Sequence, residues 1–385
     1  MIIYLSVLLL LFFCIYEYDI RGLRQNRIFF IRLVLLVLIF VSGFAYRLGG
    51  DGMLYFLDYK KYGTISDLSF SYLTGFEGKQ PGWVLLVSLC KTITSSYWFF
   101  KLVHAIIVNL AYVNLIRNNA KYVFSGLLIY FSLIYFNQNF QILRESLAIS
   151  FFFFSIPFFK SGKWVKYYLL SLIAISFHIG AIFLLILPIV KLLGVNKYTI
   201  ALYLVLGFFF IRYASEFLEL IMTVKLDGDI QGKVYYYTHD LDTQYNFVYW
   251  SNAILNILFP LVIISYYHKK RLFIPYILPA VIGIIVYVVS LVLPIAYRFS
   301  NYFLIFSYIL ISDFIIRWIM SLNIRDIRAF FVYLFLIVFI LFKGRIYLSN
   351  YGDTNIPSYV QYYPYASIFD KYEDPKREKL FKSIQ

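Results

Sequence analysis

The sequence has little charge. Only 14% of its 385 residues are Asp, Glu, Lys or Arg, and 62% are hydrophobic, whereas soluble domains average about 25% charged residues. A soluble globule of this length could not cover its surface with so few charges. Cysteine is also scarce: Cys14 and Cys90 are the only two, both within apolar stretches. This excludes a disulfide framework and a cysteine-based metal site.

Several motifs are also missing. The sequence has no G-x-x-x-x-G-K-[ST] motif, so nothing indicates coupling to ATP. It has no HExxH motif and no carboxylate cluster, so we expect no bound catalytic metal and no cofactor. The net charge of +15 comes from short Lys and Arg clusters between apolar runs, which is the pattern of cytoplasmic membrane loops rather than of nucleic-acid binding. Short alternating segments, as in a membrane barrel, do not occur.

Long apolar runs are abundant instead. They predict an all-α, polytopic integral membrane protein of about 11–12 transmembrane helices, some broken or re-entrant. The apolar runs are 2–16, 28–46, 97–116, 122–136, 142–159, 167–190, 198–211, 247–267, 273–293, 299–316 and 329–347. Run 2–16 lacks a charged start and a small-residue cleavage site, so we expect a retained first span. We predict a single membrane domain over 1–385.

Basic clusters between the runs predict the orientation. They are Arg21, Arg24 and Arg27; Arg117 and Lys121; Lys160, Lys163 and Lys166; Lys269, Lys270 and Arg271; and Arg317, Arg325 and Arg328. If all five are cytoplasmic, 82–93 must be re-entrant or interfacial. In addition, 167–190 must form two half-length helices, or 198–211 must not cross fully. The regions predicted to face outside are the loop 47–81, the large loop 212–246 and the C-terminal tail 348–385.

Ionisable groups at membrane depth cost roughly 2.5–3.5 kcal/mol each, so they point to function. Arg47 and Asp51 lie in AYRLGGDGMLY, just after the second span. Gly49, Gly50 and Gly52 would let this backbone turn sharply and approach a ligand closely. The alternative is an ion pair between Arg47 and Asp51 that fixes the loop.

A second polar segment is NQNFQILRESLAIS, residues 137–150. Arg144 and Glu145 open an apolar helix there, where the arginine would point toward an anion together with the first helical amides. The alternative is a local ion pair whose side chains reach the interface. The amides that precede it both donate and accept hydrogen bonds, which suits a sugar. They are Asn137, Gln138, Asn139 and Gln141.

Two further residues complete the set. His178 lies at the midpoint of 167–190, where a neutral imidazole could act as a general base; the alternative is a buried, satisfied histidine. Arg298 lies in LPIAYRFSNYF at a helix junction. In the predicted topology Arg47, Arg144 and Arg298 converge on the outer leaflet. Arginine's planar fork binds phosphate, so these three predict a site for a lipid-linked phosphate or diphosphate.

The ordered set of motifs resembles the EpsG family of polysaccharide polymerases, relatives of the Wzy-type O-antigen and capsule polymerases. The matching residues are Arg47-x-Gly49-x-Asp51 with Tyr55, QPGW at 80–83, Ile142-Leu-Arg144-Glu-Ser-Leu-Ala148, Phe177-His178, and Tyr297-Arg298 with Tyr302. They span 46–302, about two thirds of the chain. Position 80 holds Gln where an acidic residue is common in the family, and position 145 holds Glu where Gln is common.

This resemblance implies a fold similar to the GT-C-like membrane glycosyltransferases. It implies polymerisation of glycan repeat units carried on undecaprenyl diphosphate, without metal, at the outer face of a bacterial inner membrane. The product would be O-antigen (lipopolysaccharide), capsule or exopolysaccharide. Partners on this view are the lipid-linked oligosaccharide, membrane lipid, a chain-length regulator and a flippase, with no nucleic acid.

The resemblance also suggests roles. Arg47, Arg144 and Arg298 would bind the diphosphate. His178 leads as the base, with Glu145 and Asp51 as competitors. The residues expected to contact the glycan are Gln138, Asn139, Gln141, Tyr55 and Tyr297.

Two other functions compete with a polymerase. A flippase for lipid-linked oligosaccharides would also need buried arginines, but the sequence shows no two-half repetition of the kind many transporters carry. A membrane acyltransferase that modifies a polysaccharide could use His178 as its base. Such enzymes take their acyl donor largely from the cytoplasm, whereas the polar residues here are predicted to face outward.

Overall fold

The computed structural model describes residues 2–75, 79–193, 252–270, 276–291, 296–321, 344–345, 347–351 and 355–384, with a few single residues between 202 and 213. In these residues the chain is helical, and the β-type pairings are two isolated bridges, Ala45–Ser367 and Asn350–Pro357. The all-α prediction is thereby confirmed for the described part. The chain divides into two compact units, Met1–Ile182 with Ser312–Gln385, and Phe183–Ile311.

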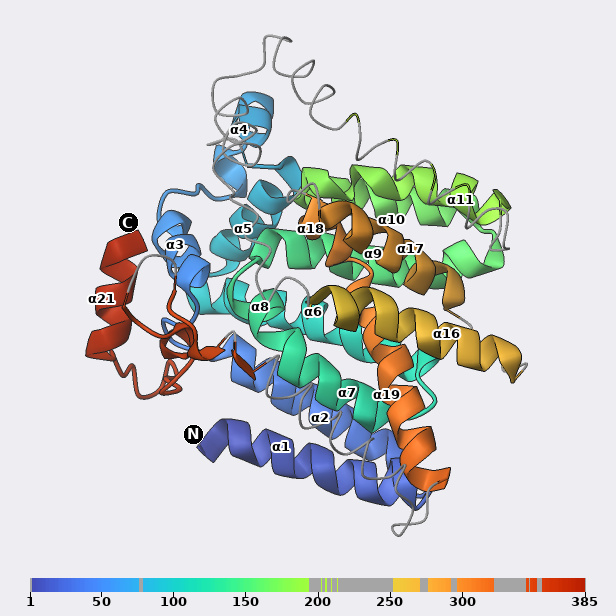
Figure 1. The fold of residues 1–385 in the computed structure, drawn as a ribbon. Coiled ribbons are helices and arrows are strands. Elements are labelled where there is room, and N and C mark those ends of the chain that lie inside the picture. Colours follow the sequence, from blue (N-terminus) through green and yellow to red (C-terminus); the bar gives the residue numbers. More distant parts are fainter. Residues whose placement is uncertain are drawn as a thin grey trace. The chain divides into compact units, whose positions relative to one another are not determined.

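The first unit is built from helices of very different lengths (Figure 1). Its N-terminal elements are α1 (Ile2–Cys14), the π-helical turn η1 (Ile15–Ile20), α2 (Arg27–Gly43), α3 (Gly50–Tyr59), the 3₁₀ turn η2 (Ile65–Asp67), α4 (Phe70–Gly75) and α5 (Pro81–Ile93). Its central elements are α6 (Tyr97–Asn119), α7 (Val123–Leu133), α8 (Tyr135–Phe140), α9 (Leu143–Ser161) and α10 (Trp164–Phe177). Its C-terminal elements are η8 (Ser358–Gln361) and α21 (Pro375–Ile384).

Within the described residues, three helical segments are long and apolar enough to cross a membrane: Ile2–Ile20, Tyr97–Asn119 and Leu304–Ser321. At 1.5 Å per residue, α6 is about 34 Å long and exceeds the hydrocarbon thickness of a bilayer. The shorter apolar helices of the described chain are Pro81–Ile93, Val123–Leu133, Trp164–Phe177, Ile179–Leu192, Ile254–Lys269 and Ile277–Ser290. The predicted number of spans therefore stays a prediction.

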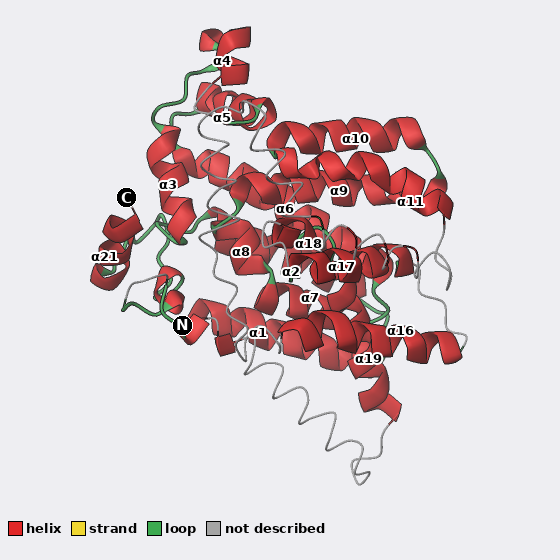
Figure 2. Ribbon diagram, turned by 45° about the horizontal axis from the view of Figure 1, so that its top comes forward, coloured by secondary structure: helices red, strands yellow, loops and turns green. Residues whose placement is uncertain are grey.

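Helix α6 is the centre of the first unit. It packs against α2 and α9, and α10 packs along α9; the two views show these neighbours side by side (Figures 1 and 2). A network of hydrogen-bonded polar side chains is buried between these helices. Asn109 on α6 donates to the side-chain oxygen of Asn139 at 3.0 Å and accepts from the Tyr130 hydroxyl at 3.0 Å. The large majority of buried polar side chains in proteins are hydrogen-bonded in this way.

Local sequence explains several helix boundaries. Pro81 occupies the first position of α5, where its missing N–H costs nothing. Helix α9 ends at Gly162 in the left-handed conformation, with φ of +69°, as expected for a C-terminal glycine. The run 167–190 is broken: α10 ends at Phe177, His178 is extended, and the 3₁₀ helix η4 (Ile179–Ile186) follows. Of the two alternatives for this region, the structure has the first, a run divided into two shorter helical segments at His178.

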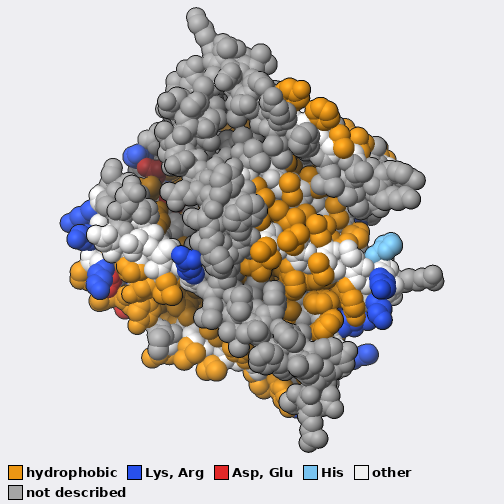
Figure 3. Space-filling model, in the orientation of Figure 1, with side chains coloured by type: hydrophobic (Ala, Val, Ile, Leu, Met, Phe, Trp, Pro, Cys, Tyr) orange, Lys and Arg blue, Asp and Glu red, His pale blue; other side chains and the backbone are white. Residues whose placement is uncertain are grey.

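The outward faces of the helices are apolar. On α1, Val7 and Leu11 are buried while Leu9 and Phe12 are more than half exposed. Hydrophobic side chains also cover the outer face of α16 (Phe259–Lys269), and basic side chains gather at its C-terminal end (Figure 3). Helices that are apolar on both the inner and the outer face are typical of a membrane protein.

The C-terminal segment packs on the turn that follows α2. The Tyr46 amide donates to the Ala366 carbonyl at 2.8 Å, and the Ile368 amide donates to the Phe44 carbonyl at 2.9 Å. Arg377 is buried and donates to three carbonyls, those of Arg47, Val360 and Pro364. In Figure 1, α21 lies beside α3. The tail and the segment 44–50 therefore lie together, and the side of the membrane they face stays a prediction.

The second unit, Phe183–Ile311, consists mainly of short helices. It contains α11 (Leu187–Leu193), the π-helical turn η6 (Ile254–Leu258), α16, α17 (Ile277–Ser290), α18 (Tyr297–Ser300) and the beginning of α19 (Leu304–Ser321). Phe183 packs edge-on against Tyr302 at 5.0 Å between ring centroids. Gly283 on α17 lies against Phe303, where an added Cβ would be 2.7 Å from the Phe303 Cβ. The loop 212–246 and most of the runs 198–211 and 329–347 lie outside the described residues.

Candidate functional site

The glycine-rich segment after Arg47 forms a tight turn into α3. Gly49 has φ of +82°, which side chains rarely adopt. A Cβ on Gly52 would lie 2.7 Å from the Phe140 carbonyl oxygen, and one on Gly49 would overlap the same residue. The predicted sharp turn is confirmed. The close approach that these glycines allow is to the backbone of Phe140, at the end of α8.

Two glutamine side chains from other segments accept hydrogen bonds from the first backbone amides of α3. The Gly50 amide donates to Gln361 Oε1 at 3.1 Å, and the Asp51 amide donates to Gln141 Oε1 at 3.0 Å. Gln141 in turn donates to Gln361 Oε1 and to the Tyr362 hydroxyl, the latter at 2.8 Å. Gln141, predicted to contact the glycan, thus connects the turn to the C-terminal tail.

Arg47 pairs with the tail. Its Nε donates to Glu378 Oε1 at 2.8 Å, its second guanidinium nitrogen pairs with the other Glu378 oxygen, and Glu373 lies at 3.8 Å. Burial lowers the pKa of Arg47, but the hydrogen bond and charge of Glu378, followed by the charge of Glu373, outweigh it and raise the pKa overall. The guanidinium is therefore already neutralised in this conformation. Its diphosphate-binding role stays a prediction.

The QPGW motif at the start of α5 contacts three other helices, α3, α9 and α10. Gln80 immediately precedes α5 and accepts a hydrogen bond from Arg144 Nη1 at 3.2 Å. A Cβ on Gly82 would lie 2.8 Å from the Ser176 carbonyl oxygen, so only glycine lets α5 approach the end of α10 this closely. Trp83 is buried, lies 5.1 Å from the Tyr55 ring, and donates to the Tyr62 hydroxyl at 2.8 Å. The motif thereby holds Arg144, Tyr55 and the segment before His178 in one region.

Arg144 brings a positive charge to the QPGW motif. It lies in the first turn of α9, and its Nε is buried without a hydrogen-bond partner in the described part of the chain. Burial raises the pKa of Tyr55; the charge and hydrogen bond of Arg144 oppose this, and the charges of Asp51 and Glu145 add to it. Tyr55 therefore lies within electrostatic reach of one guanidinium and two carboxyl groups. Glu145 is itself buried.

His178 marks the break after α10. Its Nδ1 accepts a hydrogen bond from the Gly180 amide at 3.2 Å, which orients the ring locally. Ser176, two residues earlier, lies against Gly82, and Gly82 is two residues after Gln80. His178 therefore belongs to the same part of the first unit as the QPGW motif. Its role as base stays a prediction.

Two of the predicted glycan ligands lie in the core. Asn139 is fully buried, and its amide is bonded to Asn109, the Tyr130 hydroxyl and the Tyr135 carbonyl. Gln138 is also buried. The paired Asn139 amide stabilises the packing, and because both side chains are buried, neither lies on a surface that a glycan could touch in this conformation.

Tyr297 and Arg298 lie in α18 of the second unit. Tyr297 is 51% exposed, and its ring centroid is 6.4 Å from that of Tyr287. Their predicted roles in glycan and diphosphate binding stay predictions.

Some residues of the site were not predicted. Gln361 lies in the tail, 220 positions from Gln141, and no local pattern in the sequence indicated this contact. Lys101 could have been identified from the sequence as a candidate functional residue. It is an ionisable residue inside the apolar run 97–116, and such residues are rare at membrane depth.

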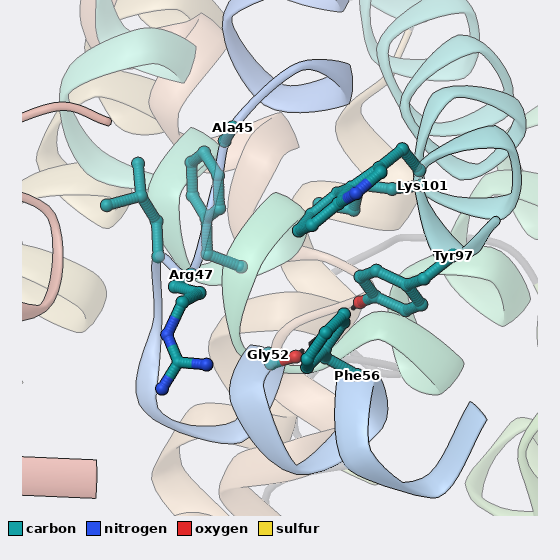
Figure 4. Close-up of a pocket in the computed structure, with 9 residues that line it drawn as sticks. Ala45, Arg47, Gly52, Phe56, Tyr97 and Lys101 are labelled. Atoms are coloured by element: carbon teal, nitrogen blue, oxygen red, sulfur yellow. Dashed lines mark hydrogen bonds between the residues drawn. The ribbon is translucent and has the colours of Figure 1, made fainter. Parts of the chain in front are cut away.

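A small pocket adjoins the turn (Figure 4). Arg47, Gly52 and Phe56 line it from the turn and α3, and Tyr97 and Lys101 line it from α6. The Tyr97 hydroxyl is directed at the Gly52 carbonyl, 3.5 Å away. In the described residues no three His, Cys, Asp or Glu side chains are grouped so as to hold a metal ion.

Comparison with known proteins agrees with the motifs. The model of the EpsG family matches residues 28–367, which covers most of the chain. No curated protein and no solved structure matches significantly. The matched region includes the turn after α2, the QPGW motif, the start of α9, the break at His178 and α18. The chain therefore belongs to the EpsG family, a family of Wzy-like polymerases.

Proposed function

We propose that this protein polymerises a surface polysaccharide by transferring a glycan from undecaprenyl diphosphate to the terminal sugar hydroxyl of a lipid-linked repeat unit. The acceptor oxygen bonds to the anomeric carbon of the donor, and the bond from that carbon to the diphosphate oxygen breaks. The acceptor proton passes to a base, and undecaprenyl diphosphate leaves with the bonding electrons. We place this reaction at the outer face of a bacterial inner membrane.

The observation that carries the proposal is the environment of Arg144. Gln80 and Tyr55 hold its guanidinium, while its Nε is buried without a partner in the described residues. A donor held in advance at a water-poor site stabilises negative charge as it develops on a leaving group. A guanidinium can supply this stabilisation without a metal ion. Asp51 and Glu145, whose charges act on Tyr55 beside Arg144, are two candidate bases, and His178 is the third.

The glycan product in cells tests the proposal. Deleting the gene should leave single repeat units on the lipid carrier at the outer face, because export continues while polymerisation stops. Electrophoresis of carrier-linked and surface glycans measures this. A deletion strain with no repeat units outside would indicate the flippase instead. Full-length glycan that lacks acyl groups would indicate the acyltransferase.

A further inference from the structure

Lys101 is a buried amine that the proposed reaction does not use. It lies in the second turn of α6 and is 4% exposed. Its Nζ donates to the Asn139 carbonyl and lies 4.8 Å from the centroid of the Phe140 ring. No carboxylate pairs with it in the described part of the chain. An ammonium group has three N–H donors, so one carbonyl and one ring leave it short of partners, and a buried charge without a counter-ion is costly.

The pocket is lined by Lys101 and by aromatic side chains, among them Phe56 and Tyr97 (Figure 4). Phe56 and Trp98 line it, stack with their ring centroids 5.5 Å apart at 20°, and are both partly exposed. The space inside is about that of one water molecule. One oxygen of a carboxylate would therefore fill it, while the rest of an acidic sugar would lie outside, against the partly exposed rings of Phe56 and Trp98.

The charged side chains that line the pocket favour a ligand group with a single negative charge. Arg47 also lines the pocket, but Glu378 and Glu373 already neutralise it. One cation, Lys101, remains for a ligand. A diphosphate carries more charge than one ammonium can balance, whereas a carboxylate matches it.

We propose that this pocket is a subsite for an acidic sugar of the repeat unit, with the carboxylate of a hexuronic acid bound by Lys101 and its ring placed against Trp98. The inference rests on the proposed polymerase function and names the substrate class of that same site. Gly52 and Phe56 of the pocket belong to α3, the helix that also carries Asp51 and Tyr55. An acidic residue of the glycan would thus be anchored next to the reacting region.

The test is a binding titration on the full-length protein in detergent. The probes are methyl glucuronide and methyl glucoside, which differ in the carboxylate, and saturation-transfer NMR with Trp fluorescence reports binding. We expect the glucuronide to bind at least about tenfold more tightly, the scale of one charge-assisted hydrogen bond. Lys101→Met should remove this preference. Lys163→Met, a change of an exposed lysine, is the matched control and should preserve it.

Three outcomes would overturn the proposal. Equal binding of both sugars by the unmodified protein does so without any variant, so a folding defect of Lys101→Met cannot obscure the result. An unchanged preference in a folded Lys101→Met protein also overturns it. Binding of pyrophosphate that depends on Lys101, without glucuronide binding, would assign the pocket to the lipid carrier. Selective glucuronide binding by a protein with no polymerase activity would instead contradict the proposed function and keep the subsite.

Discussion

At the residue scale, the two predicted diphosphate ligands of the first unit have different surroundings. Arg47 is paired by Glu378 in the C-terminal helix. Arg144 is held by the uncharged side chains of Gln80 and Tyr55 and keeps a buried N–H without a partner in the described residues. A pre-oriented cation whose donors are not all used is better suited to a developing anion than one already neutralised. Arg144 is therefore the residue on which the reaction should depend most.

Arg144→Lys should slow polymerisation by roughly 100–1,000-fold, the effect typical of losing one such donor. Lysine keeps the charge but lacks the planar fork that reaches two partners at once. The measurement is the initial rate with purified protein and a lipid-linked repeat unit. Arg21→Lys, at a half-exposed arginine paired with Glu17, is the control and should be neutral. A rate for Arg144→Lys equal to that of the unmodified protein would remove Arg144 from the mechanism.

His178→Gln separates a base from a structural histidine. Glutamine can still accept the hydrogen bond from the Gly180 amide, but it cannot take up a proton at neutral pH. We expect normal insertion, normal substrate binding and turnover reduced by about 100-fold or more. His268→Gln, at the exposed end of α16, is the matched control. Turnover close to normal in His178→Gln would transfer the role of base to Glu145 or Asp51.

At the element scale, a glycine lets the short helix α5 pack closely against the end of α10. Gly82→Ala should separate α5 from α10, because an added Cβ would lie within 3.0 Å of two backbone atoms of Ser176. We expect a loss of roughly 1–3 kcal/mol in unfolding free energy, as for other overpacked contacts, together with reduced activity. Thermal unfolding in detergent measures the first effect. Gly344→Ala meets open space and should leave the melting temperature unchanged; equal effects of both would contradict the packing described for α5.

Glu378→Gln tests how the C-terminal helix is held. The partly buried pair with Arg47 would lose its charge, leaving a guanidinium that Glu373 contacts only at 3.8 Å. We expect a loss of about 1–2 kcal/mol, below the full cost of breaking a buried pair because both side chains are partly exposed. Protease cleavage of the tail should become faster. Glu17→Gln, in an i,i+4 pair on an exposed surface, should cost only about 0.2–0.5 kcal/mol.

The elements differ in how far sequence alone could predict them. The start of α5 at Pro81 and the break at His178 follow from local signals, a proline and a polar residue inside an apolar run. The burial of Asn139 could not be predicted, because its partner Asn109 lies on another helix. The contacts of the C-terminal tail could not be predicted either. Gln361 and Glu378 bind residues of the turn after α2 that are more than 300 positions away in the sequence. Contacts at such separation leave no periodic pattern in the sequence.

At the scale of the whole molecule, the site is assembled from segments far apart in the chain. Helix α3, the QPGW motif, the start of α9 and the end of α10 lie together in the first unit through Gln80, Gly82 and Trp83. The sequence indicated each motif but could not show how they meet. Arg298 belongs to the second unit, so its predicted convergence with Arg144 stays a prediction, testable by Arg298→Lys in the same rate assay.

The central claim is polymerisation by the protein's own side chains, and one reaction tests it most directly. Purified protein in detergent, given a lipid-linked repeat unit and excess EDTA, should produce a ladder of glycans of increasing length with release of undecaprenyl diphosphate. The ladder should match the one formed without chelator, because Arg144 rather than a metal ion stabilises the departing diphosphate. Loss of the ladder in EDTA and its return on adding a divalent cation would contradict the account, as would the absence of any ladder under both conditions.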